Sequence, residues 1–253
     1  MPEAPEGAAR VSDACRNCGV TFATGQNFCG ACGQRTNISP QLTMRELGHD
    51  LVHAITHADH SIFALIRALL TRPGHVARDY VAGRRKRHFG PFAFLVIAVG
   101  LASAVILISG VEWFQPFQHG RAGDILQRHV NLVILAQAPL LALFCMALFR
   151  REGCSFAEHF VLAAYASGLR ALFLALIETP LLALTGADTA NPWLASAYFG
   201  IWFSYFAFAA AQFYRGNRIW SAFKAIVAAV LSQVLTVTLI MAFLFFTSRL
   251  AGT

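Results

Sequence analysis

Four cysteines near the start of the chain have the spacing of a metal site. The order is Cys15-x2-Cys18-x10-Cys29-x2-Cys32, and a glycine follows each pair. Each C-x2-C turn presents two thiolates to one cation, and four thiolates complete the tetrahedral shell that zinc prefers. The pattern predicts a structural zinc ribbon over residues 15–36, with no open position for a substrate. The alternative is a pair of disulfides, which we disfavour because the segment is expected to be cytosolic, where thiols stay reduced.

The two other cysteines are not expected to bind the metal. Cys145 lies within an apolar run and Cys154 lies close to the end of one. Both are therefore predicted to pack against apolar neighbours.

A histidine stripe forms a second candidate metal site on the helix predicted for residues 42–70. Apolar residues recur there at three- and four-residue steps, and His49, His53, His57 and His60 fall within about 80° of one another on the opposite face. Histidines four apart on a helix can chelate one ion. We favour the competing interpretation, an amphipathic helix that lies on the membrane with a histidine-rich polar face.

The same histidines almost form a metalloprotease motif. The string His49-Asp50-Leu51-Val52-His53 has aspartate where the zincin motif HExxH has glutamate. The glutamate is the general base of those enzymes, and the shorter aspartate does not reach the metal-bound water in the same way. A membrane metalloenzyme built on His49, His53 and His57 is therefore the least favoured function.

A basic cluster directly precedes the first long apolar run. It consists of Arg84, Arg85, Lys86 and Arg87, and Pro91 follows shortly after. Such a cluster marks the cytosolic end of a membrane span and contacts anionic lipid headgroups. We do not expect nucleic-acid binding, because it would compete with the headgroups for the same side chains.

Several short strings in residues 15–95 form a specific combination. They are Phe28-Cys29-x-x-Cys32-Gly33-Gln34, His49-Asp50-x-x-His53-x-x-x-His57-x-Asp59, Thr71-Arg72-Pro73-Gly74-His75, Tyr80, Gly83-x-Arg85 and His88-Phe89-x-Pro91. Together they resemble a bacterial membrane-protein family known only as domain of unknown function 3667. The resemblance implies a bacterial zinc-ribbon membrane protein. It also implies that the histidines belong to the pattern of the family.

Composition excludes an ordinary soluble protein. The chain has 253 residues, of which 57% are hydrophobic and 13% are charged, with a mean hydropathy of +0.54. Soluble domains carry about 25% charged residues.

Five runs approach the roughly 20 apolar residues that cross a bilayer. They are Phe92–Val111, Val130–Phe149, Phe160–Leu184, Trp193–Phe213 and Phe223–Phe246. The predicted fold is thus an all-α integral membrane protein with about five transmembrane helices, preceded by a small cytosolic zinc ribbon and an amphipathic interfacial helix.

The distribution of Lys and Arg predicts how the spans are oriented. With the N-terminus inside, cytosolic segments carry 16 of these residues and outer segments carry three. This split fits the positive-inside rule and predicts a cytosolic N-terminus and a periplasmic C-terminus in a bacterial inner membrane.

The first residues have no basic region followed by an apolar core, so no signal peptide is expected. The predicted domains are a disordered segment 1–14, the ribbon 15–36, an amphipathic and basic segment 40–88, and a five-helix domain 89–253.

Two charged residues fall inside the third predicted span. Arg170 and Glu178 are eight residues apart, which places them about 80° apart around a regular helix. They are candidates either for a polar path through the membrane or for a structural bridge between helices. Pro180 follows closely, so the span is expected to be kinked or broken there.

The leading functional hypothesis is a non-enzymatic inner-membrane protein whose zinc ribbon docks a protein partner or senses a signal. The chain has no P-loop, no G-x-S-x-G string and no HExxH string. The alternative hypotheses are a small-solute or metal-ion transporter lined by Arg170 and Glu178, and the metalloenzyme described above. Structural zinc is the only cofactor predicted, and the predicted partners are the bilayer, its anionic headgroups and one protein.

Overall fold

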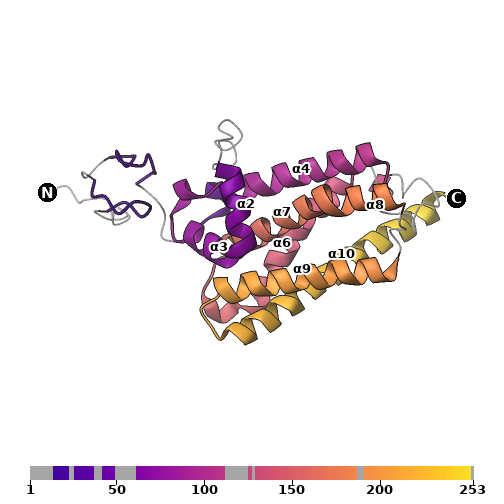
Figure 1. Cartoon of the computed structure of the whole chain (residues 1–253). Helices are drawn as coiled ribbons and strands as arrows, with labels where there is room; N and C mark the ends of the chain where they lie inside the picture. Colours follow the sequence, from indigo (N-terminus) through magenta and orange to yellow (C-terminus); the bar gives the residue numbers. More distant parts are fainter. Residues whose placement is uncertain are drawn as a thin grey trace.

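The computed structural model describes residues 14–22, 26–36, 42–48, 61–111, 125–126, 129–186 and 191–251. These residues form an all-α bundle with a small cysteine-rich ribbon at one end, and no β-strand occurs among them (Figure 1). The named helices are α2 (Ser61–Thr71), α3 (Pro73–Val81), α4 (Pro91–Ser109), α6 (Val130–Leu148), α7 (Phe156–Phe173), α8 (Thr179–Thr185), α9 (Pro192–Phe213) and α10 (Arg218–Ala251).

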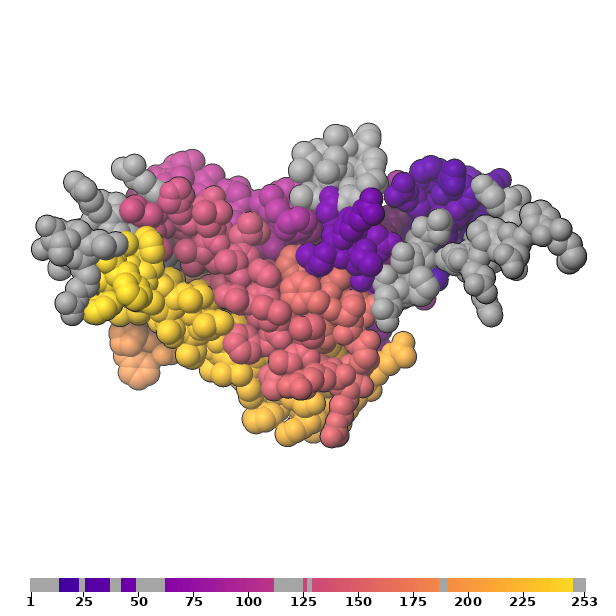
Figure 2. Space-filling model, turned by 180° about the vertical axis from the view of Figure 1, so that it is seen from behind, coloured from indigo at the N-terminus to yellow at the C-terminus, as the bar shows by residue number. Residues whose placement is uncertain are grey.

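Five helical segments are long and apolar enough to cross a membrane. They cover Arg85–Ser109, Val130–Leu148, Phe156–Thr185, Pro192–Phe213 and Arg218–Thr247. The predicted fold class and number of spans are therefore confirmed, with ends that differ from the predicted ones by up to seven residues. The ribbon and the end of α10 lie at opposite ends of the molecule, as the view from behind also shows (Figure 2).

The third span is the central helix of the bundle. About two thirds of its apolar window is buried, a larger share than in any of the other four candidate spans of the described chain. Its start is fixed by a capping box, in which the Ser155 side chain accepts from the amide of Glu158 while the Glu158 carboxylate accepts from the amide of Ser155. Gly168 lets α4 approach closely, since a Cβ there would lie 2.7 Å from two ring atoms of Phe94.

The expected break in the third span is a π-helical turn. Residues Leu174–Glu178 form this turn between α7 and α8, and the amide of Thr179 bonds to the carbonyl of Leu174. Pro180 explains the turn, because proline has no amide to donate and its ring pushes away the carbonyl four residues earlier. The inserted residue also turns the helix by about one 100° step, so the 80° separation predicted for Arg170 and Glu178 shrinks to about 20°.

A short helix holds the ribbon end of the bundle together by packing on α9. In α3, the amide of Gly74 donates to the Gln212 side chain at 3.1 Å. The Arg78 guanidinium donates to the carbonyl of Phe213 at 2.7 Å and 3.1 Å. That carbonyl is one of the last four of α9, which have no partner within their own helix. Arg78 therefore caps α9 and fixes the position of α3 against it.

The predicted amphipathic helix over 42–70 is described only at its two ends. Residues 44–48 are helical, and so is α2. In α2, Leu65 and Leu69 are buried, whereas Phe63 is 75% exposed and Leu70 is 61% exposed. The apolar exposed face is what an interfacial helix requires, and its position on a membrane stays a prediction.

Candidate metal centre

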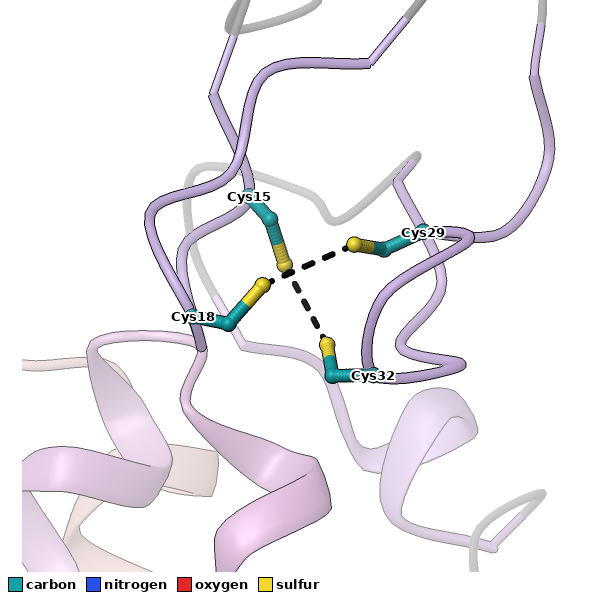
Figure 3. A group of neighbouring side chains, drawn as sticks. All are labelled: Cys15, Cys18, Cys29 and Cys32. Atoms are coloured by element: carbon teal, nitrogen blue, oxygen red, sulfur yellow. Dashed lines mark hydrogen bonds between the residues drawn. The ribbon is translucent and has the colours of Figure 1, made fainter.

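The structure brings the four cysteines of the ribbon together around one point. Their sulfur atoms all lie within 4.8 Å of one another and face a common space (Figure 3). The distances Cys15 Sγ–Cys32 Sγ and Cys18 Sγ–Cys29 Sγ are both 3.6 Å. A tetrahedral ion with zinc–sulfur bonds of about 2.3 Å requires sulfur–sulfur distances of about 3.8 Å. A disulfide requires about 2.05 Å, and all four cysteines are free.

Two backbone turns of the same form hold the four sulfurs. In the first, the amide of Gly19 donates to the carbonyl of Cys15 at 2.8 Å, and the amide of Cys15 donates to the carbonyl of Val20 at 2.9 Å. In the second turn, Gly33 and Gln34 make the equivalent bonds with Cys29, both at 2.8 Å. Each turn thus has the form of a knuckle that presents two sulfur atoms, and the ribbon is a pair of such knuckles.

Glycine is required in both knuckles by the backbone. Gly19 has φ of +77° and Gly33 has φ of +69°, a region that other residues rarely adopt. This conformation turns the following amide toward the second sulfur of each pair. Hydrogen bonds from the Asn17 side chain and from the backbone of Gln34 lower the pKa of the Cys32 thiol to about 6. The lowered pKa favours the thiolate of Cys32, which is the form that binds metal.

The four-thiolate set can hold a divalent cation but cannot activate a substrate on it. All four positions of a tetrahedral shell are filled by protein, whereas catalytic zinc keeps one position for water or substrate. Cys15 and Cys29 are buried, and Cys18 is exposed. Metal at this centre would therefore stabilise the ribbon, as small metal folds require.

Gln34 joins the second knuckle to the segment that leads into α4. We call residues 83–87 the basic turn. The Gln34 Nε2 donates to the carbonyl of Gly83 at 2.7 Å, and its Oε1 accepts from the amides of Arg85 and Lys86 at 3.1 Å and 3.2 Å. The Gln34 residue is only 4% exposed. One side chain thus satisfies three backbone groups of the basic turn, 49 to 52 positions away in sequence.

Two further contacts link the ribbon to the basic turn. The Arg16 side chain lies over Gly83, where a Cβ would be 3.0 Å from Arg16 Cδ. The Lys86 side chain passes Gly33, where a Cβ would be 4.0 Å from Lys86 Cε. Both knuckles therefore meet the basic turn, the first through Arg16 and the second through Gln34 and Gly33.

The other members of the basic cluster bind nearby carboxylates or remain exposed. Arg85 contacts Glu46 at 3.3 Å, and Arg84 contacts Asp79 at 2.8 Å. Lys86 and Arg87 are exposed. The predicted contact of this cluster with headgroups stays a prediction.

The histidine stripe lies outside the described residues. His49, His53, His57 and His60 all belong to the segment 49–60, for which the structure gives no description. The second metal site, and the metalloenzyme that would need it, therefore stay predictions.

Arg170 bridges three helices within the membrane domain. Its Nε donates to the Tyr198 hydroxyl at 2.6 Å on α9, and its Nη1 donates to Gln137 Oε1 at 2.8 Å on α6. The guanidinium also lies 5.0 Å from the ring centroid of Trp202. In the described part of the chain, Arg170 and Glu178 form no ion pair within 4.0 Å. These contacts favour the structural bridge over the polar path, since the donors of Arg170 are used between helices.

Sequence reasoning named the four cysteines but missed the role of Gln34. The available signal was its position, because the residue two places after a C-x2-C pair lies at the end of the metal-binding turn. Gln34 is only 4% exposed, whereas Val20, at the equivalent place of the first knuckle, is 48% exposed. The sequence did not reveal which segment would receive the glutamine.

The family comparison falls on the segment that connects the ribbon to the bundle. No curated protein and no solved structure matches the chain. Residues 59–102 match the model of a family described as "Protein of unknown function (DUF3667)". This segment contains α2, α3, the basic turn and the first part of α4, and the match confirms the resemblance to that family.

Proposed function

We propose that this chain is a non-enzymatic multi-pass protein of the bacterial inner membrane whose zinc-loaded ribbon acts as a sensing and docking module at the cytosolic face. One observation carries the proposal, namely that Gln34 takes part in two sites at once. Its backbone belongs to the knuckle of Cys29 and Cys32, and its side chain binds the backbone of residues 83–86. A change at the metal centre therefore acts on the start of the first span.

The sensing role follows from how small metal folds gain their stability. Such folds depend on metal binding, because the ribbon has too few buried side chains to fold alone. Loss of the ion frees the backbone around Cys29 and Cys32, and Gln34 loses its fixed position. Three hydrogen bonds to the basic turn are lost together. The metal state of the ribbon is in this way transmitted to residues directly before α4.

Zinc is the ion we assign to the centre. Four thiolates in a tetrahedral arrangement suit zinc, which imposes no other geometry and undergoes no redox change. An iron–sulfur cluster would also use four cysteines, but the sulfur–sulfur distances of 3.6 Å suit a single ion.

The docking role uses the exposed apolar side chains of the ribbon. Val20 is 48% exposed and Phe28 is 56% exposed, and the Arg35 guanidinium lies 6.0 Å from the centroid of the Phe28 ring. An exposed aromatic ring beside an arginine is typical of the residues that dominate protein interfaces. We place the contact with a protein partner at these exposed side chains.

The orientation of the chain is tested by reporter fusions. A reporter after Thr253 should be active when it requires the periplasm, because five spans and the 16-to-three distribution of Lys and Arg put that end outside. A reporter at the N-terminus should be active only when it requires the cytosol. Strong cytosolic activity at Thr253 would contradict the orientation.

Hydrogen exchange tests the sensing role in the full-length protein. The amides of Arg85 and Lys86 should be protected when zinc is bound, because both donate to Gln34. Removing zinc, or making the Gln34→Ala substitution, should speed the exchange of these two amides by about fivefold or more. A fivefold change corresponds to the loss of one hydrogen bond that contributes about 1 kcal/mol.

The matched control is Gln26→Ala, which removes an exposed glutamine side chain of the same ribbon. It should leave the exchange of Arg85 and Lys86 unchanged. If chelation of zinc leaves both amides as protected as before, the metal state does not reach the basic turn, and the sensing role is wrong.

A further inference from the structure

We infer that the ribbon and anionic lipid headgroups compete for the basic turn, so that metal occupancy decides which of them binds Lys86 and its neighbours. This inference rests on the proposed function and names its regulation. The ligand is the phosphate group of an anionic phospholipid. The zinc-loaded ribbon holds the basic turn, and the metal-free ribbon releases it to the membrane.

Contacts show why both partners cannot use the basic turn fully at once. The ribbon occupies the backbone of Gly83, Arg85 and Lys86 through Gln34, and the Cε of Lys86 would lie 4.0 Å from a Cβ at Gly33. A lysine reaches headgroup phosphates by extending this part of its side chain toward the membrane surface. Release of the ribbon therefore increases the number of basic side chains available to the lipid.

Charge favours the same exchange. A divalent ion with four thiolates carries a net charge of about −2. Residues 14–36 contain Arg16 and Arg35 and no carboxylate, so only these two cations offset that charge within the ribbon. In the basic turn, Arg84 and Arg85 contact carboxylates, whereas among the described residues Lys86 and Arg87 have no carboxylate within 4.0 Å. Zinc loading thus makes the ribbon a better partner for Lys86, whose side chain lies beside Gly33 of the ribbon.

Reciprocity turns the competition into a measurable effect on zinc binding. If zinc loading draws the basic turn away from anionic lipid, then anionic lipid must weaken zinc binding by the same factor. One basic side chain near an anionic surface contributes roughly a fivefold change in affinity. Competition for Lys86 therefore predicts about fivefold weaker zinc binding in an anionic membrane.

The test measures zinc affinity of the full-length protein in nanodiscs by competition with a chelator, under reducing conditions. One set of nanodiscs contains only phosphatidylcholine, and the other also contains phosphatidylglycerol. The quantity compared is the ratio of the two dissociation constants. For the unmodified chain this ratio should be about five or more. For Gln34→Ala it should fall by about half or more, because docking to the basic turn is already weakened.

Gln26→Ala is the control and should keep the ratio of the unmodified chain. Zinc also concentrates near an anionic surface, but it does so equally for all variants in the same nanodisc, and the comparison between variants cancels this effect. Equal ratios for Gln34→Ala and the unmodified chain would overturn the competition while leaving the zinc site intact. A chain that binds no zinc in either membrane would overturn the proposed function itself.

Discussion

Replacing Cys29→Ser should abolish tight metal binding and unfold the ribbon while the helical bundle remains folded. Cys29 is buried and supplies one of the four sulfurs that lie within 4.8 Å of one another. Loss of a residue that only supports a ligand costs a metal site about 10–100-fold in affinity, so loss of the ligand itself should cost at least about 100-fold. Structural zinc contributes roughly 10–16 kcal/mol to the folding of such small units, which makes the ribbon dependent on it.

Metal analysis of the purified protein measures this effect directly. The unmodified chain should contain one zinc ion, and Cys29→Ser should contain almost none. Cys154→Ser is the matched control, because Cys154 lies outside the sulfur cluster and bonds only weakly to the Glu152 carbonyl at 3.9 Å. It should retain the ion. A Cys29→Ser protein with full zinc content would contradict the assignment of the site.

The bundle should survive the loss of zinc because its contacts are elsewhere. The central helix α7 packs on α4, α6, α9 and α3, whereas the contacts described above for the ribbon are to the basic turn. The melting temperature of the membrane domain should therefore change little in Cys29→Ser. This difference separates a metal that folds the ribbon from a metal that holds the whole protein together.

The parts of the fold that the sequence predicted correctly are those encoded by neighbouring residues. The knuckles depend on Cys-x2-Cys-Gly strings, whose glycines have the positive φ that such turns need. The five spans depend on runs of apolar residues, and a membrane core imposes helices on any such run. In both cases the physical cause lies within a few residues or turns, so one sequence suffices to see it.

Contacts between distant segments could not be predicted in the same way. Gln34 could have bonded to water, to the ribbon or to any exposed backbone, and only the folded chain shows that residues 83–86 receive it. The π turn is an intermediate case. Pro180 indicated a break in the third span, because proline has no amide to donate to the helix. A kink, a gap or a π turn would each have accommodated that missing hydrogen bond.

Replacing Gly74→Ala should strongly destabilise the bundle, although it adds only one methyl group. A Cβ at Gly74 would collide with the carbonyl oxygen of Ala209 and would lie 2.5 Å from Gln212 Cβ and 2.6 Å from the amide nitrogen of Phe213. Two of these three atoms belong to the backbone of α9, so they cannot rotate away as a side chain can. The helix α3 must therefore move away from α9.

That movement has a large cost because α3 is also bonded to α9. The hydrogen bonds from Gly74 to Gln212 and from Arg78 to the Phe213 carbonyl would lengthen or break. Overpacking costs about 1–3 kcal/mol, and each lost hydrogen bond adds about 1 kcal/mol, so we expect a loss of at least about 3 kcal/mol. This change is measured by thermal unfolding of the protein in detergent. Unfolding is monitored by the loss of the monodisperse peak in size-exclusion chromatography.

Gly200→Ala provides the matched control within α9. No atom lies within 4 Å of the added methyl group there, and alanine favours a helix more than glycine does. Its melting temperature should equal or exceed that of the unmodified chain.

If Gly74→Ala melts at the same temperature as Gly200→Ala, α3 is not packed against α9 as described. In that case Gln212→Ala, which removes the acceptor of the Gly74 amide, should also be silent. If the packing is as described, Gln212→Ala should instead lower the melting temperature by a smaller amount than Gly74→Ala, because it removes a hydrogen bond without adding a collision.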